Sequence, residues 1–302
     1  MDPSWRLPVT RPSPYVRRRW LGREIRRLRG EHDMTAEPLA RAVGFPRQQL
    51  SALENGHLGP DIDLVSAICE YLTVGIKRRT AIMDAAADGW ARGWWDADTQ
   101  RMGVRQALYA DLESGTTTIA EYALALVPGL LQTAGFADAR LRSDPTRYPE
   151  TFDPAAAVAA RAHRQELLLA SGGPRYEVVL DEFAIRRCAA EPGVVADQLR
   201  HIVAVCAARA TVTVQVLPMN APIKGHSAPR SAYSIYRYGV EPGVAVAVDT
   251  LTKDLVLTEP DEIDPYLSLH RRLKAAALAS EASLRLLHAA AQELSPIEGA
   301  AA

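Results

Sequence analysis

Between residues 20 and 89 the apolar positions recur at the spacing of α-helices. A first helix carries Leu21, Ile25 and Leu28 at i, i+4 and i+7, which places them on one buried stripe. A second helix is expected over residues 36–43, where Gly44 ends it in a left-handed conformation. A third covers about 46–55. Two more, near 61–72 and 77–87, complete a compact five-helix bundle.

From residue 105 to 295 the apolar spacing switches between helical and alternating. The β-branched run 211–217 alternates most clearly, and further strands are expected at 176–180, 232–238, 244–250 and 254–257. Helices are expected at 120–127, 129–142, 154–169, 194–209, 265–279 and 281–294. Strands mixed with helices predict an α+β domain behind the helical bundle.

These patterns divide the chain into five parts. Residues 1–19 contain Pro3, Pro8, Pro12 and Pro14, which break both helix and strand, so a flexible basic arm is expected there. The helical domain follows at 20–89. An aromatic linker at 90–104 contains Trp90, Trp94 and Trp95, for which interdomain packing is favoured over a ligand cage. The α+β domain covers 105–295, and a disordered tail is expected at 296–302.

Charge is distributed unevenly along the chain. The formal net charge is −1, yet residues 1–60 contain 11 arginines and six acidic residues. A basic front on an acidic body indicates an anionic partner for the front. The three cysteines have no CxxC spacing, and neither a signal peptide nor an apolar run of about 20 residues is present. We therefore expect a cytoplasmic protein without a membrane partner.

The third helix, PRQQLSALEN, carries the most specific chemistry. Two helices joined by a short turn that contains Gly form a helix-turn-helix, whose second helix enters the major groove of DNA. Arg can bind guanine through O6 and N7, and Gln can bind adenine through N6 and N7. The predicted DNA-binding residues are Thr35, Arg47, Gln48, Gln49, Ser51 and Asn55. Arg23, Arg26 and Arg27 are candidate phosphate contacts, with an ordinary solvated face as the alternative.

The segment LARAVGFPRQQLSALENG resembles the helix-turn-helix of the Xre type, the group that contains Cro and the phage repressors. The resemblance covers roughly residues 20–75 and implies a regulator that binds double-stranded DNA. Two positions depart from the pattern. Pro46 stands where Ser or Thr usually caps the recognition helix, and Pro38 stands where Glu is common, so the usual capping box is absent.

The second domain resembles the C-terminal domain of WhiJ-like actinobacterial regulators, which are described as antitoxin-like. The residues that carry this resemblance are VPGLLQT (127–133), YEVVLDEFAIRR (176–187), QLRHIV (198–203) and VTVQVLP (212–218). Asp249 departs from it, since Glu is expected there. The resemblance implies a small partner protein encoded nearby, and it supports a family more than a mechanism.

Sites for catalysis, metal or cofactor are not expected. Ser227 superficially resembles a nucleophile elbow, but the expected strand ends near Leu217, ten residues earlier, and Pro229 replaces the final Gly. Asp181 and Glu182 with Arg186 and Arg187 are interpreted as a salt-bridge cluster. No HxxxH pair or glycine-rich phosphate loop occurs. The protein is therefore expected to be no enzyme, and to use no cofactor.

The favoured function is a sequence-specific transcriptional regulator at the nucleoid, with residues 46–55 in the major groove. The second domain would then serve regulation, dimerisation or partner binding. One alternative is an antitoxin-like protein that neutralises or senses a small partner protein, and another is a ligand-gated regulator. Because helix-turn-helix regulators bind palindromes as dimers, a homodimer is expected, with 194–209 and 281–294 as candidate dimer elements.

Overall fold

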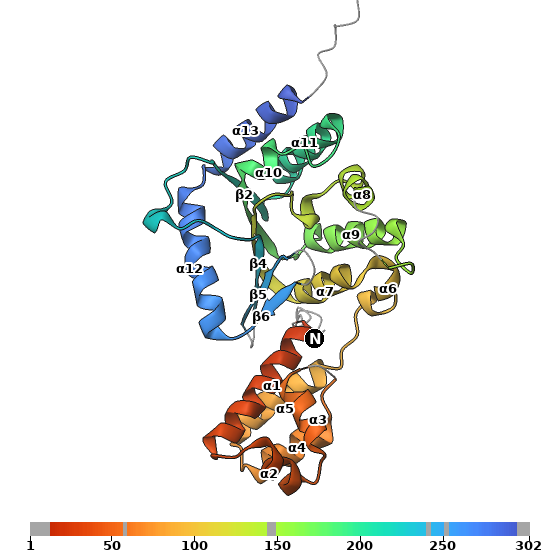
Figure 1. Ribbon diagram of the computed structural model, residues 1–302, viewed down its shortest axis with the longest axis vertical. Helices are drawn as coiled ribbons and strands as arrows, with labels where there is room; N and C mark the ends of the chain where they lie inside the picture. Colours follow the sequence, from red (N-terminus) through yellow and green to blue (C-terminus); the bar gives the residue numbers. More distant parts are fainter. Residues whose placement is uncertain (1–12, 57–58, 144–148, 240–242, 251–253, 295–302) are drawn as a thin grey trace, which may run out of the picture. The chain divides into compact units, whose positions relative to one another are not determined.

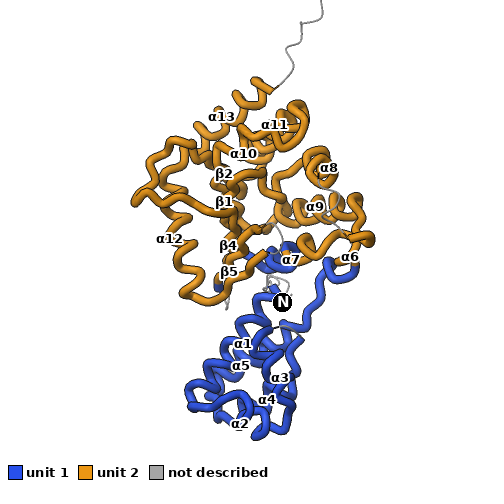
Figure 2. Tube along the Cα trace, in the orientation of Figure 1, with its two compact units in different colours: residues 1–97, 109–116, 238–243 blue, residues 98–108, 117–237, 244–302 orange. Residues whose placement is uncertain are grey.

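The computed structural model describes residues 13–56, 59–143, 149–239, 243–250 and 254–294. The chain divides into two compact units, which Figure 2 shows in blue and orange. Unit 1 comprises residues 1–97, 109–116 and 238–243, and unit 2 comprises 98–108, 117–237 and 244–302. The expected tail at 296–302 and the first 12 residues of the expected arm lie outside the described residues.

Unit 1 contains the helical bundle that the apolar spacing predicts. Its helices at the start of the described chain are α1 (Pro14–Glu31), α2 (Ala36–Val43), α3 (Arg47–Glu54), α4 (Ile62–Tyr71) and α5 (Ile76–Asp88) (Figure 1). The stripe of Leu21, Ile25 and Leu28 on α1 is buried as expected. It packs in one core with side chains from the other helices, among them Leu39, Leu50, Leu64, Ile68 and Ile82.

The expectation of a flexible arm is wrong from residue 14 onward, because α1 begins there. Pro14 occupies the first helical turn, where a missing N–H costs no helical hydrogen bond. Ser13 is the N-cap and accepts a hydrogen bond from the Val16 N–H at 3.1 Å. Asp111 of α7 (Val104–Glu113) accepts from the Ser13 hydroxyl and from the Tyr15 N–H. The start of α1 is thus fixed by a residue almost 100 positions later.

The expected linker at 90–104 contains short helices, η1 (Trp94–Asp96) and α6 (Thr99–Met102). Trp95 is buried and meets Trp94 edge to face, with 6.1 Å between the ring centroids. Trp90 is 56% exposed and donates its indole N–H to the carbonyl of Pro60. These contacts lie within unit 1.

A mixed six-stranded sheet organises the described part of unit 2. Its strands are β1 (Thr116–Ala123), β2 (Arg175–Asp181), β3 (Val212–Leu217), β4 (Tyr233–Tyr238), β5 (Val244–Val248) and β6 (Leu255–Leu257). They lie in the order β3-β2-β1-β4-β5-β6. β1, β2 and β3 run parallel, with Tyr122 opposite Val179, whereas β5 is antiparallel to β4 and β6. The sheet with its helices confirms the α+β class.

The helices of unit 2 lie on both faces of the sheet, with α12 on one side and α8 and α9 on the other (Figure 1). β1 and β2 are connected through η2 (Gly129–Leu131), α8 (Ala134–Arg142) and α9 (Pro154–Leu169). β2 and β3 are connected through α10 (Glu182–Arg186) and α11 (Pro192–Ala208). A short turn, η4 (Lys224–His226), precedes β4, and α12 (Pro260–Ala276) and α13 (Ser280–Glu293) close the fold.

One expected helix is wrong. Residues 120–123 belong to strand β1, not to a helix over 120–127. Ile119, Ala120, Tyr122 and Ala123 are all buried, because β1 is a central strand. A strand buried on both faces gives a near-continuous apolar run, which apolar spacing alone does not distinguish from a buried helix.

Candidate DNA-binding surface

The turn between α2 and α3 has the geometry that a helix-turn-helix needs. Gly44 ends α2 in the left-handed region at φ 74°, and the Phe45 N–H donates to the carbonyl of Ala40 at 3.0 Å. A residue with a Cβ is strained in that conformation, so glycine suits this position. Leu39 on α2 and Leu50 on α3 are fully buried. The turn therefore holds the two helices at a fixed angle over the core of unit 1.

Helix α3 presents a polar face at its N-terminal half. Arg47, Gln48, Gln49 and Ser51 are all exposed, while Leu50 and Leu53 point into the core. Pro46 is the N-cap and provides no side-chain hydrogen bond to the first turn. The first N–H groups of a helix attract phosphate. This end of α3 thus combines exposed Arg and Gln side chains, which are able to bind base edges, with a terminus that favours an anion.

Helix α1 braces the opposite end of α3. Arg29 donates from Nε and Nη2 to the two carboxylate oxygens of Glu54, at 2.7 and 3.0 Å. This hydrogen bonding raises the pKa of Arg29 above its usual value. Arg26 donates to the Glu54 carbonyl at 3.0 Å and to Asn55 Oδ1 at 3.1 Å. Cations beside the last carbonyls of a helix also oppose the negative end of its dipole.

The two helices approach closely at Gly22. A Cβ added there would lie 2.5 Å from the Glu54 carbonyl oxygen and 2.6 Å from that of Leu53. Only glycine permits this backbone separation. Glycine on α1 and the arginines beside it therefore define where α3 lies relative to the rest of the bundle.

The roles of Gly22, Arg29 and Glu54 were not predicted from the sequence. A signal was present, because Glu54 follows the inward-facing Leu53 and comes four residues after Leu50, so part of it must lie toward the core. A carboxylate in such a place needs a cation, and α1 is the arginine-rich neighbour. The pairing itself depends on how the helices cross, which the spacing does not contain.

The other predicted DNA-binding residues are Thr35 at the start of α2, Ser51 within α3 and Asn55 at the end of α3. Thr35 is the exposed N-cap of α2, but its side chain makes no capping hydrogen bond. Asn55 is the C-cap of α3, and its amide donates to the Ser51 carbonyl at 2.7 Å. The structure thus brings Ser51 and Asn55 together and places Thr35 on the neighbouring helix. Their contacts with DNA stay predictions.

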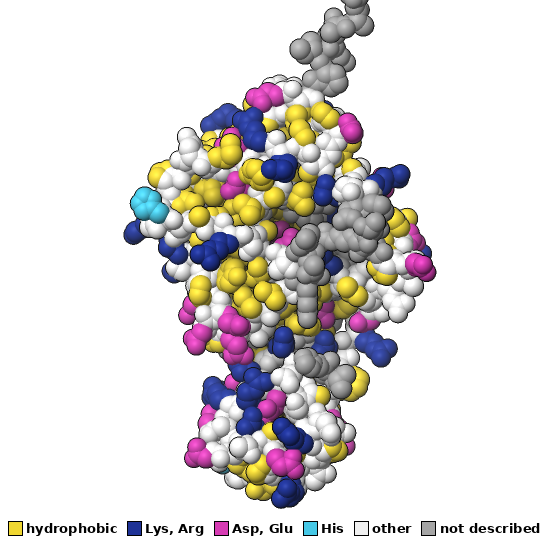
Figure 3. Space-filling view, viewed as in Figure 1, with side chains coloured by type: hydrophobic (Ala, Val, Ile, Leu, Met, Phe, Trp, Pro, Cys, Tyr) yellow, Lys and Arg dark blue, Asp and Glu magenta, His cyan; other side chains and the backbone are white. Residues whose placement is uncertain are grey.

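Among the candidate phosphate contacts, Arg26 and Arg27 make ion pairs within unit 1. Arg27 pairs with Glu31 at 3.0 Å and with Glu24 at 3.7 Å, while Arg26 contacts Glu54 and Asn55. Arg23 is half-buried. In Figure 3 the visible face of the bundle shows basic side chains beside acidic ones. Much of the arginine excess in this region therefore serves to hold the bundle together.

The remaining candidate residues have structural contacts in unit 2. Ser227 accepts a hydrogen bond from Arg272 Nη1 at 2.6 Å. Asp181 caps α10 and accepts from the Tyr122 hydroxyl at 2.8 Å, and Glu182 pairs with Arg186 at 3.2 Å. Across the described ranges, no cluster of three or more His, Cys, Asp or Glu side chains is arranged to hold a metal ion.

Among the described helices, none has the length and apolar character needed to cross a membrane.

Comparisons with known proteins agree with this division of the chain. A helix-turn-helix family model matches residues 25–77, which run from the middle of α1 to the start of α5 and contain the candidate surface. A second model, described as a domain of unknown function (DUF5753), matches residues 106–289. No solved structure matches the chain.

A curated relative is similar over a short segment. It is named Antitoxin PezA, from Streptococcus pneumoniae serotype 4, and is 39% identical over 54 residues. That alignment covers 18% of this chain, and the chain spans about a third (34%) of the relative's length. The helix-turn-helix match supports a DNA-binding regulator, and the match over most of the remaining chain shows that this protein belongs to the DUF5753 family.

Proposed function

We propose that the chain is a sequence-specific transcriptional regulator whose helix α3 reads the major groove of double-stranded DNA. The observation that carries the proposal is the exposed cluster of Arg47, Gln48 and Gln49 at the start of a helix fixed against α1. Exposed side chains at this end of the second helix are the ones that meet base edges. In this role the protein acts by binding at the nucleoid, and not as an enzyme.

The matched experiment compares three versions of the full chain. Duplexes selected from a random library by the wild type are titrated with the wild type, an Arg47→Ala, Gln48→Ala double variant and an Arg142→Ala control. Arg142 lies on α8 of unit 2 with a side chain that is 79% exposed. Loss of each base contact costs about 1–3 kcal/mol, so the double variant loses about 2–6 kcal/mol, which is roughly 30-fold in affinity or more.

Binding to random duplex separates the base contacts from the phosphate contacts. The base-reading variant keeps most of the residual affinity for random duplex, because phosphate contacts supply it. The Arg142→Ala control matches the wild type on every duplex. The proposal is rejected if the selected pool shows no enrichment, or if the double variant binds selected and random duplexes as the wild type does.

A second candidate function is recognition of a small partner protein, as in an antitoxin. The observation in its favour is the similarity to a protein named as an antitoxin, which covers 18% of the chain. Coexpression with the product of an adjacent small gene, followed by size-exclusion chromatography, tests it. A one-to-one complex supports this function, and separate elution of the two proteins at micromolar concentration excludes that product as the partner.

A further inference from the structure

The N-terminal half of α1 lies outside the helix-turn-helix match. That match begins at residue 25, whereas α1 begins at Pro14. The first turn of α1 is held by Asp111, which lies inside the DUF5753 match and belongs to the same compact unit as α1. One continuous helix therefore receives contacts from both matched regions.

The contact at the start of α1 is polar and buried. Ser13 is fully buried and Asp111 is 8% exposed. Oδ1 of Asp111 accepts from the Ser13 hydroxyl, and it also accepts from the Tyr15 N–H at 3.1 Å. Burial raises the pKa of Asp111, and the hydrogen bonds from Ser13 and Tyr15 oppose that rise. Because a buried carboxylate is costly without its donors, the first turn of α1 and the Asp111 side chain hold each other in place.

Tyr238, the last residue of β4, joins this contact. Its buried hydroxyl donates to the carbonyl of Leu112 at 2.7 Å, one residue after Asp111. Residues 109–116 and 238–243 belong to unit 1, although α7 and β4 continue from them into unit 2. A displacement of α7 or of the end of β4 therefore moves the groups to which the start of α1 is bonded.

The C-terminal half of α1 holds α3. It does so through the close backbone approach at Gly22 and the bidentate pair between Arg29 and Glu54. Ser13 and Arg29 are 16 residues apart, which is about 24 Å along a helix axis. Helix α1 runs unbroken over Pro14–Glu31, so a displacement of one end can reach the other.

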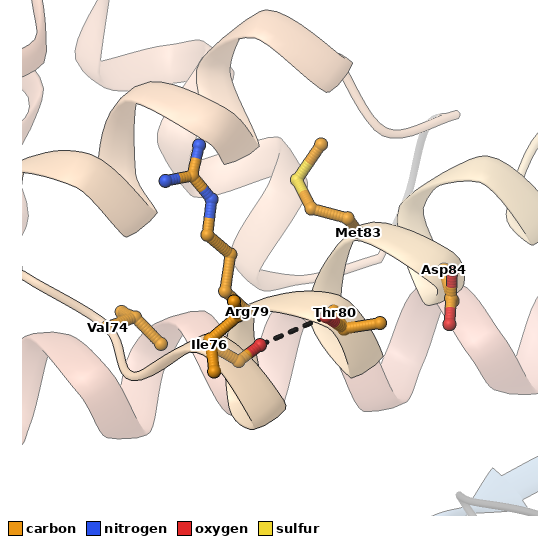
Figure 4. Close-up of a pocket in the computed structure, with 6 residues that line it drawn as sticks. All are labelled: Val74, Ile76, Arg79, Thr80, Met83 and Asp84. Carbon is orange, nitrogen blue, oxygen red and sulfur yellow. Dashed lines mark hydrogen bonds between the residues drawn. The ribbon is translucent and has the colours of Figure 1, made fainter.

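A contact on α5 shows the contrast. The Thr80 hydroxyl donates to the carbonyl of Ile76 at 3.0 Å, beside an open hollow of about 530 Å³ (Figure 4). Both groups belong to one turn of one helix, so this bond constrains only that turn. The bond between Ser13 and Asp111 joins segments 98 positions apart, and it can therefore pass a change from one segment to the other.

We propose that Asp111 is a positioning residue for α3, and that the segments 109–116 and 238–243 control DNA binding by holding or releasing the start of α1. With the contact closed, α1 is fixed at both ends and α3 keeps its position. With the contact open, the first turns of α1 are released and α3 loses part of its support. This inference rests on the proposed function, and it gives the DUF5753-matched region a route by which to regulate that function.

The coupling is measured first without DNA, by hydrogen exchange of the full chain. The Tyr15 amide reports the contact itself, the α3 amides report its effect, and the α4 amides are the reference. Asp111→Ala speeds exchange at Tyr15 and in α3 about tenfold relative to α4. Asp111→Asn keeps an oxygen that accepts both hydrogen bonds, so its exchange stays within about threefold of the wild type.

Thr116→Val is the matched control. It removes a buried hydroxyl that donates to the Glu113 carbonyl at 2.8 Å, in the same segment as Asp111 but in a bond that does not involve α1. Its α3 amides exchange as in the wild type. Unchanged α3 exchange in Asp111→Ala, or exchange that speeds up equally in α3 and α4, overturns the inference.

A double-variant cycle tests whether Asp111 acts through α1. Variants about 24 Å apart along a helix normally have additive effects. Glu54→Gln removes the ion pair that joins α1 to α3, so adding Asp111→Ala to it speeds α3 exchange by less than about a further twofold. Additive effects contradict a route through α1.

Tyr238→Phe covers the case in which Asp111→Ala does not fold. It removes only the hydroxyl that donates to Leu112, and it speeds α3 exchange relative to α4 about threefold. Exchange of α3 equal to that of the wild type in this variant overturns the inference as well.

DNA then separates this inference from the proposed function. Duplex selected by the wild type binds Asp111→Ala about tenfold more weakly, and Asp111→Asn within about threefold of the wild type. Because coupling is reciprocal, the duplex also slows exchange of the Tyr15 amide in the wild type. If no duplex is selected, the proposed function fails, while the exchange measurements decide the inference by themselves. Equal binding of the selected duplex by Asp111→Ala and the wild type overturns the inference and leaves the proposed function standing.

Discussion

Two helix contacts in this chain each bury an ionisable side chain, one as a charged ion pair and the other as a neutral group. Where α1 meets α3, the buried carboxylate of Glu54 is paired with the Arg29 guanidinium. Where α12 meets the sheet, His270 is buried, and its Nε2 has no hydrogen-bond partner in the described structure. The first contact fixes a helix by charge. The second needs its polar group to stay neutral.

The first contact depends on the geometry of its ion pair, and the second depends on pH. A bidentate ion pair has one geometry, so it holds α3 at a defined position against α1. A neutral imidazole among tyrosines imposes less direction, but it resists protonation, because burial and the nearby Lys274 lower the pKa of His270 to about 4. Tyr233 lies 3.5 Å from its Nδ1, and Tyr266 meets Tyr233 edge to face.

The largest effect is expected from breaking the charged contact. Glu54→Gln leaves the Arg29 guanidinium, only 18% exposed, without its counterion, so unit 1 loses about 3 kcal/mol of stability. Hydrogen exchange of the α1 and α3 amides measures this loss. The control is Glu37→Gln, whose exposed partner Arg41 lies at 3.5 Å, and it costs less than about 0.5 kcal/mol. Equal losses of stability in the two variants would show that the buried Arg29–Glu54 pair contributes no more than the exposed Arg41–Glu37 pair.

The next effect concerns the close approach of the same two helices. Gly22→Ala pushes a methyl group against the Leu53 and Glu54 carbonyls, so it costs about 2 kcal/mol and lowers DNA affinity by displacing α3. Gly30→Ala is a control on the same helix, because a Cβ there meets nothing within 4 Å. It leaves stability unchanged or raises it by about 0.5 kcal/mol. Thermal unfolding and DNA titration of the Gly22→Ala and Gly30→Ala variants test this prediction.

Acid is expected to destabilise the contact around His270, because that contact needs a neutral imidazole. The folded pKa of His270 lies below its unfolded value, so its contribution is complete above about pH 6.5 and is lost as pH falls toward 4. Unit 2 loses about 1–2 kcal/mol between pH 8 and pH 5 from this group. Lys274 and Arg237 oppose its protonation and Glu177 favours it. Hydrogen exchange of the α12 amides reports the loss, and His270→Gln makes that region insensitive over this range.

The smallest stability effect separates binding from folding within unit 1. Thr35→Ala costs less than about 0.5 kcal/mol, because the Thr35 side chain makes no capping hydrogen bond. Asp61→Ala costs about 1 kcal/mol, since Asp61 accepts from the N–H groups of Asp63 and Leu64 at the start of α4. If Thr35 contacts DNA, its variant binds DNA more weakly at unchanged stability. Equal DNA affinity would remove Thr35 from the surface.

Local rules predicted much of this structure. The helix expected at 154–169 is α9, where Asp153 caps and Pro154 begins the first turn. Gly44 ends α2 in the left-handed region, as its position after an apolar helix predicts. Such features depend on a few neighbouring residues. They are therefore present in the sequence whether or not the rest of the fold is known.

Features that depend on crossing geometry were not predictable. The last four residues of β1, 120–123, were expected as helix because both faces of the strand are buried there, and α12 begins at Pro260 although the helix was expected from Pro265. At the candidate site, the exposed residues of α3 follow from the helix-turn-helix pattern. The Arg29–Glu54 pair and the approach at Gly22 follow only from how α1 and α3 meet.

The cap at the start of α1 has a consequence for synthesis. Contacts among α1 to α5 join segments that leave the ribosome close together in time, and domains form from the N-terminus as the chain emerges. The Ser13 hydroxyl and the Tyr15 N–H, however, donate to the carboxylate of Asp111, which is synthesised almost 100 residues later. The first turn of α1 is therefore completed late, after α3 has been made. Helix α3 can therefore fold against the C-terminal part of α1 before the N-terminal turn of α1 is secured.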